Sequence, residues 1–592
     1  MIDYDNCRSL PAMFSAVAAE RGERPFLWAK RGGKYEGMSW AEAARAVNRL
    51  ARGLRGLGVQ PGDRVALAAE NRPEWALADL AIMSAGAITV PAYTTNTVDD
   101  HRHVFGNSGA RAVIASKPPV SDRAAAAAAQ VPSVEAIVVI EPAAQGARGW
   151  EAVLELGDTQ PDDVAERVAA LAPDDIACLI YTSGTGGVPK GVMLTHRNIL
   201  ANCAGAFHLL EMLGLGDEVF LSFLPLSHSY EHTAGLMFPI SIGAQIYFAE
   251  GADTLAANLV ETRPTIMTAV PRLYETMHQR IRRGIEREKG LKRRLFEAAV
   301  ASGRKRVTGE PLGVWQRLFD PLLDKLVRDK VRARFGGRLK AMVSGGAPLN
   351  PEIGSFFLAL GVQLLQGYGQ TEAAPVIACN RPGGNRIDSV GPPFKGVEIK
   401  IAGDGEILVA GANVMKGYWN DPEATARTIA DGWLKTGDIG HLDAERYLRI
   451  TDRKRDFIKN SGGDMIAPAK VEGALTLAPE IAQAMVWGDQ RPHLVAILVP
   501  DPEFAAQMVG KGTELEALAE HQGLVKALGD VVGAVNAKLP AVERVRRFII
   551  AREPFTTSNG QLTPTLKIRR HAVRAVYGDA LDALYDNKSA AA

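Results

Sequence analysis

The chain has 592 residues, more than a single hydrophobic core usually supports, so we expect at least two domains. Hydrophobic residues make up 47% and charged residues 23% of the sequence, as in ordinary globular proteins, and a net charge of +1 gives no general attraction to nucleic acid. The four cysteines (Cys7, Cys178, Cys203 and Cys379) lie far apart, which favours neither a zinc site nor a disulfide framework.

The first part of the chain, to about residue 170, alternates helical and strand patterns. Apolar residues recur at helical spacing over 40–57 and 75–85, and short strand patterns cover 64–69 and 88–91. Such alternation is typical of parallel sheets covered by helices, which is an α/β fold. The polyalanine run 124–129 predicts a surface helix without a functional role.

A loop rich in glycine and hydroxyl groups follows, with the sequence YTSGTGGVPKG at residues 181–191. Its glycines let backbone N–H groups turn toward an anion. The hydroxyls of Thr182, Ser183 and Thr185 add hydrogen-bond donors, and Lys190 adds a positive charge that suits a phosphate. The apolar run 176–180 before the loop predicts a buried strand. Together these features predict a mobile loop that binds nucleotide phosphates, with a plain surface loop as the alternative if the segment is taken alone.

This loop differs from the P-loop of kinases and GTPases. That pattern needs a glycine directly before the lysine and a serine or threonine after it. Here Pro189 precedes Lys190 and Gly191 follows it. The proline also prevents the loop from continuing directly into a helix.

Strand patterns resume at 219–224, 245–248 and 265–270, and the residues from about 275 to 340 are helical and basic. The basic segment 280–294 has two interpretations. It forms either a solvated helical face or a contact with an anionic membrane surface or an acidic cofactor. Its basic side chains are Arg280, Arg282, Arg283, Arg287, Lys289, Lys292, Arg293 and Arg294.

From about residue 395 the sequence becomes rich in strands and turns. Beyond the charged stretch 452–456, strand patterns at 486 and 495–499 and helices near 503–539 and 570–586 predict a smaller α+β domain. We therefore predict an N-terminal domain over 1–451, a hinge at 452–456 and a mobile C-terminal domain over 457–592.

Four further segments carry side chains suited to a nucleotide or an acid. Residues 366–372 (QGYGQTE) place a carboxylate and a flat ring in a turn with glycines, which offers a ligand for Mg²⁺ and a surface for adenine. Residues 432–438 (GWLKTGD) end in a carboxylate that can accept two ribose hydroxyls. Residues 344–348 (SGGAP) permit close approach of a ligand or form a tight strand-to-helix turn. Residues 562–567 (LTPTLK) end in a lysine that, taken alone, would be solvated surface.

In this order, and together with the loop, the segments resemble the adenylate-forming superfamily of acyl-CoA synthetases, luciferases and peptide-synthetase adenylation domains. The resemblance covers nearly the whole chain, and Gly186 is its one departure within the loop, where the family usually has a second threonine. It implies that Thr185 and Glu372 bind Mg²⁺. It also implies that ATP is bound by Tyr368 at the adenine, Thr371 at the α-phosphate, Asp438 and Arg453 at the ribose, and by Thr182, Ser183, Gly184, Gly187, Lys190, Gly345, Gly346, Ala347, Gln366, Gly367 and Gly369.

The same resemblance identifies Lys567 with the family's catalytic lysine. A carboxylate that attacks the α-phosphorus brings negative charge onto negative charge, and a cation between them stabilises the charge that develops. The resemblance also implies that His228 and Tyr230 lie beside the acyl site, and His228 is a further candidate for a catalytic residue. His232, which is nearby, is the alternative histidine for this position. Arg455 is the implied hinge, about which Lys459, Gly462 and Gly463 turn toward the site for the coenzyme A step.

Residues 458–463 (IKNSGG) and the LTPTLK ending resemble bacterial long-chain acyl-CoA synthetases. We therefore predict an acid–thiol ligase that forms acyl-adenylate from a fatty acid and Mg·ATP, and then acyl-CoA. The alternatives are transfer to a carrier protein, a ligase for another carboxylic acid, and a non-catalytic acyl- or nucleotide-binding protein on a membrane surface. Retention of Glu372, Asp438 and Lys567 argues against the last.

The N-terminal residues lack the pattern of a signal peptide, and no apolar run reaches the roughly 18–20 residues of a membrane span. We expect a cytoplasmic protein, with peripheral contact to the inner face of the membrane through 280–294 as a hypothesis. The acyl chain length and the oligomeric state are left open by the sequence, a homodimer being one alternative.

Overall fold

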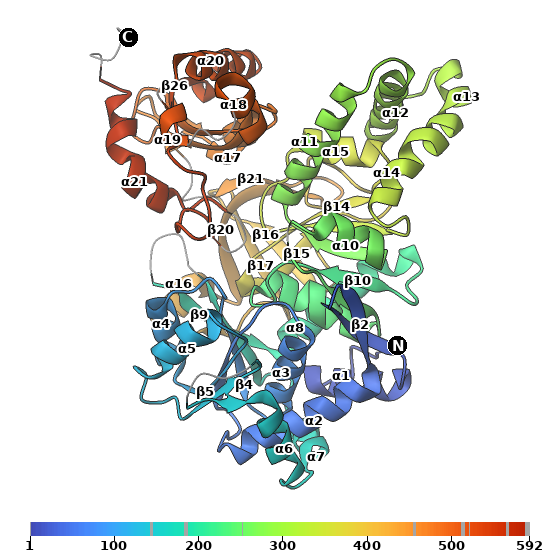
Figure 1. Cartoon of the computed structure of the whole chain (residues 1–592), viewed down its shortest axis with the longest axis vertical. Helices are drawn as coiled ribbons and strands as arrows, with labels where there is room; N and C mark the ends of the chain where they lie inside the picture. The colour runs from blue at the N-terminus through green and yellow to red at the C-terminus, as the bar shows by residue number, and fades with distance from the viewer. Residues whose placement is uncertain are drawn as a thin grey trace.

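The computed structural model describes residues 2–141, 146–182, 188–251, 253–453, 458–510, 515–519, 521–563 and 567–586, with the backbone alone at 452, 453, 516 and 517. Figure 1 shows the N-terminal region, in blue to yellow, below a smaller C-terminal domain in orange and red. A group of green helices rises beside that domain. The chain therefore has a large α/β part and a small α+β part, as predicted.

One eight-stranded sheet lies in the N-terminal region between two hydrophobic cores. Alternate residues of its strand β3 (Arg64–Ala68) point to opposite faces, because strand side chains have a period of two. Val65 and Leu67 join the core that contains α2 (Trp40–Gly56) and α3 (Pro73–Ser84), whereas Ala66 and Ala68 join the core on the other face. The remaining strands, in spatial order around β3, are β18 (Gly417–Tyr418), β9 (Lys190–Thr195), β8 (Ile176–Thr182), β4 (Ile88–Pro91), then β5 (Ala110–Ala115), β6 (Ala136–Val139) and β7 (Arg148–Gly149).

A second eight-stranded sheet shares the core of α2 and α3 with the first. In its strand β12 (Ile266–Ala269), Ile266 joins this shared core, while Met267 and Ala269 pack in an outer core with α15 (Pro351–Ala359). The strands of this sheet are parallel except for the pairs at its two edges. In spatial order around β12 they are β15 (Val376–Cys379), β14 (Leu364–Gly369), β13 (Ala341–Ser344), then β10 (Val219–Ser222), β11 (Gln245–Phe248), β1 (Pro25–Arg31) and β2 (Lys34–Ser39).

Three smaller sheets complete the described architecture, the smallest being the pair of β22 (Ile458–Lys459) and β23 (Met465–Ile466). A five-stranded sheet holds β16 (Val397–Ile401), β17 (Glu406–Gly411), β20 (Trp433–Leu442), β19 (Ile429–Ala430) and β21 (Leu448–Arg453). The C-terminal sheet holds β24 (Ile481–Trp487), β25 (Leu494–Pro500) and β26 (Val545–Ile550). Helix α20 (Gln522–Asn536) packs on one face of the C-terminal sheet and α21 (Arg570–Ala583) on the other.

The basic region near 275–340 forms the green helices of Figure 1, with α13 at their outer tip on the side away from the C-terminal domain. They are α11 (Pro271–Arg287), α12 (Leu291–Thr308), α13 (Val314–Leu323), the π-helix η3 (Asp324–Arg328) and α14 (Asp329–Arg334). Among the described residues, no helix has both the length and the apolar character that crossing a bilayer would require.

Two local predictions need correction. The polyalanine run lies in α5 (Val120–Ala128), but Ala124, Ala127 and Ala128 are buried in the core, because helical spacing puts them on one inward face. The segment predicted as a turn around Tyr368 is a strand up to Gly369, paired with β15, and only Thr371–Ala373 forms a tight helical turn.

Candidate functional site

A cleft of about 2670 Å³ lies between the large region and the C-terminal domain, and residues of both line it. Most of the predicted site residues that the structure describes lie along this cleft. They are Thr182, Lys190, His228, Tyr230, Gly345, Gly346, Ala347, Gln366, Gly367, Tyr368, Gly369, Thr371, Glu372, Asp438 and Lys567.

Tyr368 and Asp438 meet at the cleft, although 70 residues separate them. Tyr368 lies on β14 and donates its hydroxyl to Asp438 Oδ2 at 2.6 Å, while Asp438 is 5% exposed on β20. Asp438 is also paired in register with Arg453 of β21. The residues predicted for the base and for the ribose are therefore neighbours.

The Glu372 carboxylate is oriented by a residue that the sequence did not single out. Tyr418, on β18, donates its hydroxyl to Glu372 Oε1 at 2.8 Å. Burial and the neighbouring carboxylate raise the pKa of Tyr418, which keeps the phenol protonated as a donor. A carboxylate has about four lone-pair positions, so this one bond leaves Glu372 able to ligate a hard cation such as Mg²⁺. The predicted second ligand, Thr185, lies outside the described residues.

The glycine-rich segment connects two antiparallel strands, with Thr182 of β8 in register with Lys190 of β9. Lys190 pairs with Asp421 at 2.9 Å and lies 5.3 Å from the centre of the Tyr418 ring. The chain thus continues from the loop into a strand and not into a helix, as Pro189 predicted. The other loop residues proposed to bind phosphate (Ser183, Gly184, Thr185 and Gly187) lie outside the described residues.

The segment 344–348 forms the predicted strand-to-helix turn after β13. A Cβ at Gly345 would lie 2.9 Å from the ring of Tyr230, whose hydroxyl donates to the Val343 carbonyl at 2.9 Å. Gly346 has a φ of +84°, which favours glycine. The tyrosine ring alone is therefore enough to require a small residue at Gly345, and Ala347 continues the turn.

His228 is neutral at the cleft. Burial, and next the positive charge of Lys567, lower the pKa of His228 to about 3. The backbone N–H of Tyr230 donates to His228 Nδ1 at 3.1 Å, so Nε2 carries the ring proton and is a donor. Next to it, the hydroxyls of Ser229 and Thr371 are 2.9 Å apart. The C-terminal domain is therefore docked with Lys567 close to these groups.

His232, the competing histidine, is buried and pairs with Asp79 at 2.9 Å, which gives it a structural environment. Its neighbour Glu231 is buried as well, and it accepts hydrogen bonds from Ser222 at 2.7 Å and Thr268 at 2.5 Å. Burial raises the pKa of Glu231 to about 7.

The residues predicted for the coenzyme A step face elsewhere. Lys459, Gly462 and Gly463 are exposed and do not belong to the described lining of the cleft. Arg455, the predicted hinge, lies outside the described residues.

Two buried amides, like Tyr418, were not predicted from the sequence. Asn202 and Asn413 both donate to the Ala373 carbonyl, at 3.1 and 3.2 Å, and so hold the turn that carries Glu372. Asparagines within apolar runs, and a tyrosine beside a glycine in 416–419 (KGYW), were the only sequence signals for these three residues.

Comparison with known families identifies the fold. A profile of the AMP-binding enzyme family matches residues 14–419, and one of the AMP-binding enzyme C-terminal domain matches residues 455–589. The chain belongs to the AMP-binding enzyme family. The profiles thus cover both the large region and the C-terminal domain of this AMP-binding enzyme.

Individual relatives match this AMP-binding enzyme over most of its length. It is 34% identical to the long-chain-fatty-acid–CoA ligase FadD15 of Mycobacterium bovis, over 94% of this chain and 93% of the relative. It is 32% identical to the peroxisomal long chain acyl-CoA synthetase 6 of Arabidopsis thaliana, over 93% of this chain and 82% of the relative. The solved A-PCP didomain of carboxylic acid reductase from Segniliparus rugosus, in complex with AMP, aligns with a TM-score of 0.77 at 26% identity, over 98% of this chain and 82% of that one.

Proposed function

We propose that this AMP-binding enzyme is a long-chain fatty acid:coenzyme A ligase. It would form acyl-adenylate and pyrophosphate from a fatty acid and ATP, and then acyl-CoA and AMP. The observation that carries the proposal is the convergence of Lys567, the Tyr368–Asp438 pair and Glu372 on one cleft between two domains. The relatives named as long-chain-fatty-acid–CoA ligases support the choice of acid and acceptor.

In the first half-reaction, a carboxylate oxygen of the fatty acid attacks the α-phosphorus of ATP, and the bond from that phosphorus to the pyrophosphate oxygen breaks. Lys567 supplies the cation that stabilises the charge developing between the two anions. Neutral His228 supplies an Nε2–H donor without adding a second positive charge. Mg²⁺, held by Glu372 with Thr185 as the predicted partner, would neutralise phosphate charge when bound.

We propose that the nucleotide lies along the part of the cleft formed by β14, β20 and the glycine-rich segment. Tyr368 and Asp438 are proposed to bind the adenine and ribose, with Arg453 on the ribose side. Thr371 is proposed to meet the α-phosphate, and Lys190 and the glycine-rich loop to hold the phosphates that leave as pyrophosphate. Gln366, Gly367 and Gly369 would complete this part of the cleft through the backbone of β14.

In the second half-reaction, the thiol of coenzyme A attacks the acyl carbon of the mixed anhydride and AMP leaves. We propose that the C-terminal domain first rotates about Arg455, which withdraws Lys567 and presents Lys459, Gly462 and Gly463. The present exposure of these three residues fits this order of events. Two domain positions allow each half-reaction its own set of side chains.

The test is a pair of matched lysine variants. Lys567→Ala should slow adenylate formation by about a hundredfold or more, while thioester formation from supplied acyl-adenylate stays near wild type. Lys459→Ala should show the reverse pattern. Fatty-acid-dependent exchange of pyrophosphate into ATP measures the first step, and coenzyme A-dependent release of AMP measures the second. An equal loss in both steps for Lys567→Ala would refute the assigned role.

The same assays separate the rival functions. Absence of the exchange reaction would leave a binding protein, and exchange without coenzyme A-dependent AMP release would leave a ligase that serves a carrier protein. A panel of acids from short to very long, assayed with coenzyme A, distinguishes a long-chain enzyme from a ligase for another carboxylic acid. We also propose that the enzyme is cytoplasmic and meets the membrane peripherally, since its substrate is sparingly soluble.

A further inference from the structure

On helix α13 most of the large apolar side chains face the solvent, whereas an ordinary surface helix turns them toward the core. The exposed fractions on α13 are 82% for Val314, 73% for Trp315, 67% for Leu318 and 51% for Phe319. The stripe continues, one and two turns further on, through Leu322 and Leu326. We call these six residues the α13 apolar face. Monomeric proteins rarely expose such contiguous apolar surface without a partner for it.

The opposite face of α13 is turned toward the protein, where the buried Leu323 lies among polar side chains. Gln316 accepts a hydrogen bond from Lys305 of α12 at 3.2 Å. One turn along the helix, Asp320 is 1% exposed and accepts hydrogen bonds from Ser302 and Arg328, at 2.8 and 2.9 Å. Arg306 pairs with the same carboxylate. A buried carboxylate thus anchors a helix on which most of the large apolar side chains, Leu323 excepted, remain outside.

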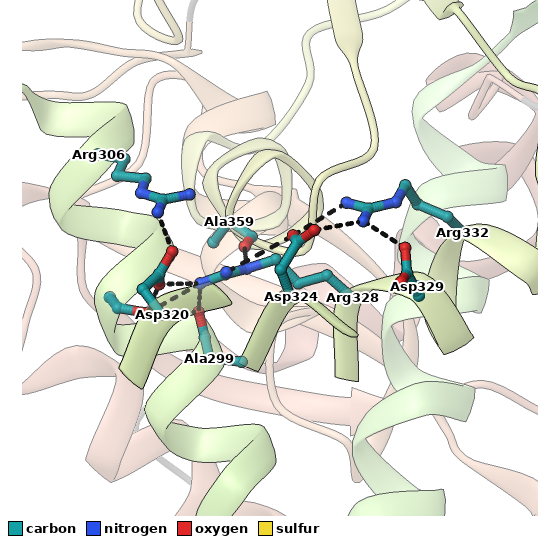
Figure 2. Close-up of polar contacts among 9 residues, drawn as sticks. Ala299, Arg306, Asp320, Asp324, Arg328, Asp329, Arg332 and Ala359 are labelled. Carbon is teal, nitrogen blue, oxygen red and sulfur yellow. Dashed lines mark hydrogen bonds and ion pairs between the residues drawn. The ribbon is translucent and has the colours of Figure 1, made fainter. Parts of the chain in front are cut away.

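Figure 2 shows that this anchor is part of a larger network. Arg328 lies at its centre and donates to the carbonyls of Ala299 and Ala359 at 2.9 and 3.0 Å, as well as to Asp320. On the far side, Arg332 pairs with Asp324 and Asp329 at 2.8 and 2.6 Å. These bonds join α12, α13, η3, α14 and the end of α15. They fix the rotation of α13 about its axis, so the helix cannot turn its apolar face inward without leaving buried charges unpaired.

The surroundings of the α13 apolar face are strongly basic. Residues 291–334 contain twelve Lys and Arg against five Asp and Glu. Three of the acids (Asp320, Asp324 and Asp329) and three of the arginines (Arg306, Arg328 and Arg332) pair with one another within the network, so an excess of basic side chains remains. Arg317 and Lys325 are exposed on the same helical segment as the apolar face. Exposed apolar side chains flanked by cations are the combination that binds the surface of an anionic bilayer.

We propose that the α13 apolar face inserts into the headgroup region of an anionic lipid bilayer, with the surrounding basic residues on the lipid phosphates. Trp315 and Phe319, whose rings are stacked with centres 6.4 Å apart, are its central anchor. The binding of α13 to the bilayer is independent of the proposed function. The purpose of that binding, which is to obtain a fatty acid from the membrane, rests on the proposed function.

The basic segment 280–294, the membrane contact considered from the sequence, is less suited to this role than α13. Within that segment, Arg283 pairs with Asp501, and Arg287 pairs with Glu503, both in the C-terminal domain. Lys292 and Arg293 pair with acidic residues on their own helices or next to them. Four of the eight basic side chains of 280–294 are therefore paired with carboxylates of the protein itself, whereas α13 has apolar groups that can enter the lipid.

The first experiment is flotation of the full-length protein with vesicles, without ATP or coenzyme A. Vesicles of equal parts phosphatidylcholine and phosphatidylglycerol are compared with pure phosphatidylcholine. The triple variant Trp315→Ser, Leu318→Ser, Phe319→Ser should lower binding to the anionic vesicles by about tenfold or more. The control triple variant Met212→Ser, Val542→Ser, Val576→Ser, at exposed positions elsewhere in the chain, should bind like wild type.

A second experiment locates the contact. Vesicles with brominated acyl chains should quench part of the tryptophan fluorescence, and Trp315→Phe, which keeps an apolar ring, should remove that quenching while binding persists. Unchanged binding of the first triple variant overturns the proposal, as does equal binding of wild type to both kinds of vesicle. A third result would also overturn it: sedimentation shows that the wild-type protein is a dimer that binds no vesicles, and the triple variant is a monomer. The α13 apolar face would then be the contact with a second copy of the chain.

These outcomes are distinct from failure of the proposed function. The first triple variant should retain wild-type pyrophosphate exchange with an acid soluble enough to be assayed without vesicles, because α13 contributes no described residue to the lining of the cleft. Loss of that exchange as well would mean that the substitutions damage the fold. The Trp315→Phe quenching measurement then still tests the contact.

Discussion

At the residue scale, the orientation of Glu372 depends on one phenol from a distant strand. Tyr418→Phe removes the hydroxyl that donates to Glu372 and keeps the ring beside Lys190. A hydrogen bond to a charged group contributes roughly 1.5–3 kcal/mol, so we expect adenylation to slow by about ten- to a hundredfold at limiting magnesium. Pyrophosphate exchange measured over a range of magnesium concentrations checks this.

Tyr447 provides the control for that substitution. Its hydroxyl donates to the Gly384 carbonyl at 2.7 Å, also in a partly buried setting, but outside the described lining of the cleft. Tyr447→Phe should therefore leave the magnesium dependence of exchange unchanged. If both variants lost the same amount of exchange activity, the loss in Tyr418→Phe would reflect damage to the fold and not a changed orientation of the Glu372 carboxylate.

The buried carboxyl of Glu231 should make stability fall as the pH rises. Its pKa is raised from an ordinary 4.5 to about 7, so the folded state binds more protons than the unfolded state between these values. The contribution of Glu231 to the free energy of unfolding is greatest below pH 4.5, decreases as the pH rises toward 7, and then levels, with a total effect of about 3 kcal/mol.

Glu231→Gln should abolish this contribution because an amide does not titrate. Its thermal midpoint relative to wild type should therefore increase between pH 5 and pH 8 at a fixed scan rate. Glu423→Gln, at an exposed carboxyl, serves as the control with a constant difference. If the difference in thermal midpoint between Glu231→Gln and wild type were also independent of pH, the pKa of Glu231 would be the same in the folded and unfolded states.

The chemistry of several residues could be predicted from the sequence, whereas their partners could not. Lys567, Asp438 and Glu372 stand in recognisable motifs, and the structure puts all three on one cleft. Tyr418 was missed because 46 residues separate it from Glu372 and only folding brings them together. The small residues of 344–348 suited either ligand approach or a tight turn, and the sequence could not show that the Tyr230 ring requires a small residue at Gly345.

At the scale of elements, the network around Arg328 should hold α12 to α14 together. Arg328→Ala leaves Asp320 buried with fewer partners, which typically costs about 3–5 kcal/mol. Arg332 is one helical turn away, but it and its partners Asp324 and Asp329 are partly or fully exposed, so Arg332→Ala should cost about 1 kcal/mol or less. Hydrogen exchange of the backbone amides in α12 and α13 measures the two local opening free energies. Equal loss of protection would show that the burial of Arg328 is of no consequence.

Elements with a clear periodic pattern were predicted well. β4 and β11 have the predicted bounds, and α2 ends within one residue of its predicted end, because apolar periodicity and flanking glycines determine them locally. The strand at Tyr368 was predicted as a turn because its glycines suggest one, but pairing with β15 outweighs that preference. The outward apolar face of α13 was likewise beyond prediction, since periodicity identifies an apolar stripe but not the side on which the protein lies.

At the scale of the whole molecule, the contact between α11 and the C-terminal domain sets the domain orientation. Arg283 pairs with Asp501 and donates to the Pro479 carbonyl at 3.2 Å, and Gln279 donates to the Thr476 carbonyl at 3.4 Å. Asn350 adds a bond to the Gly473 carbonyl at 3.1 Å. The sequence could not predict this docking, because each of these side chains resembles a solvated surface group. In this orientation Lys567 lies at the cleft, so under the proposed mechanism the contact would favour the first half-reaction.

Weakening that contact should change the balance between the two half-reactions. Arg283→Ala removes the ion pair with Asp501 and preserves that residue's own role as the N-cap of α18 (Pro502–Val509). A ligand or contact shifts a two-state equilibrium only by its differential stabilisation, and a half-buried pair provides on the order of a fivefold shift. Adenylation in single-turnover experiments should therefore slow by about fivefold, while thioester formation from supplied acyl-adenylate is unchanged or faster. Arg282→Ala, the adjacent exposed arginine, is the matched control and should alter neither rate. If Arg283→Ala slowed both steps to the same extent, the contact would stabilise the fold without selecting a domain orientation.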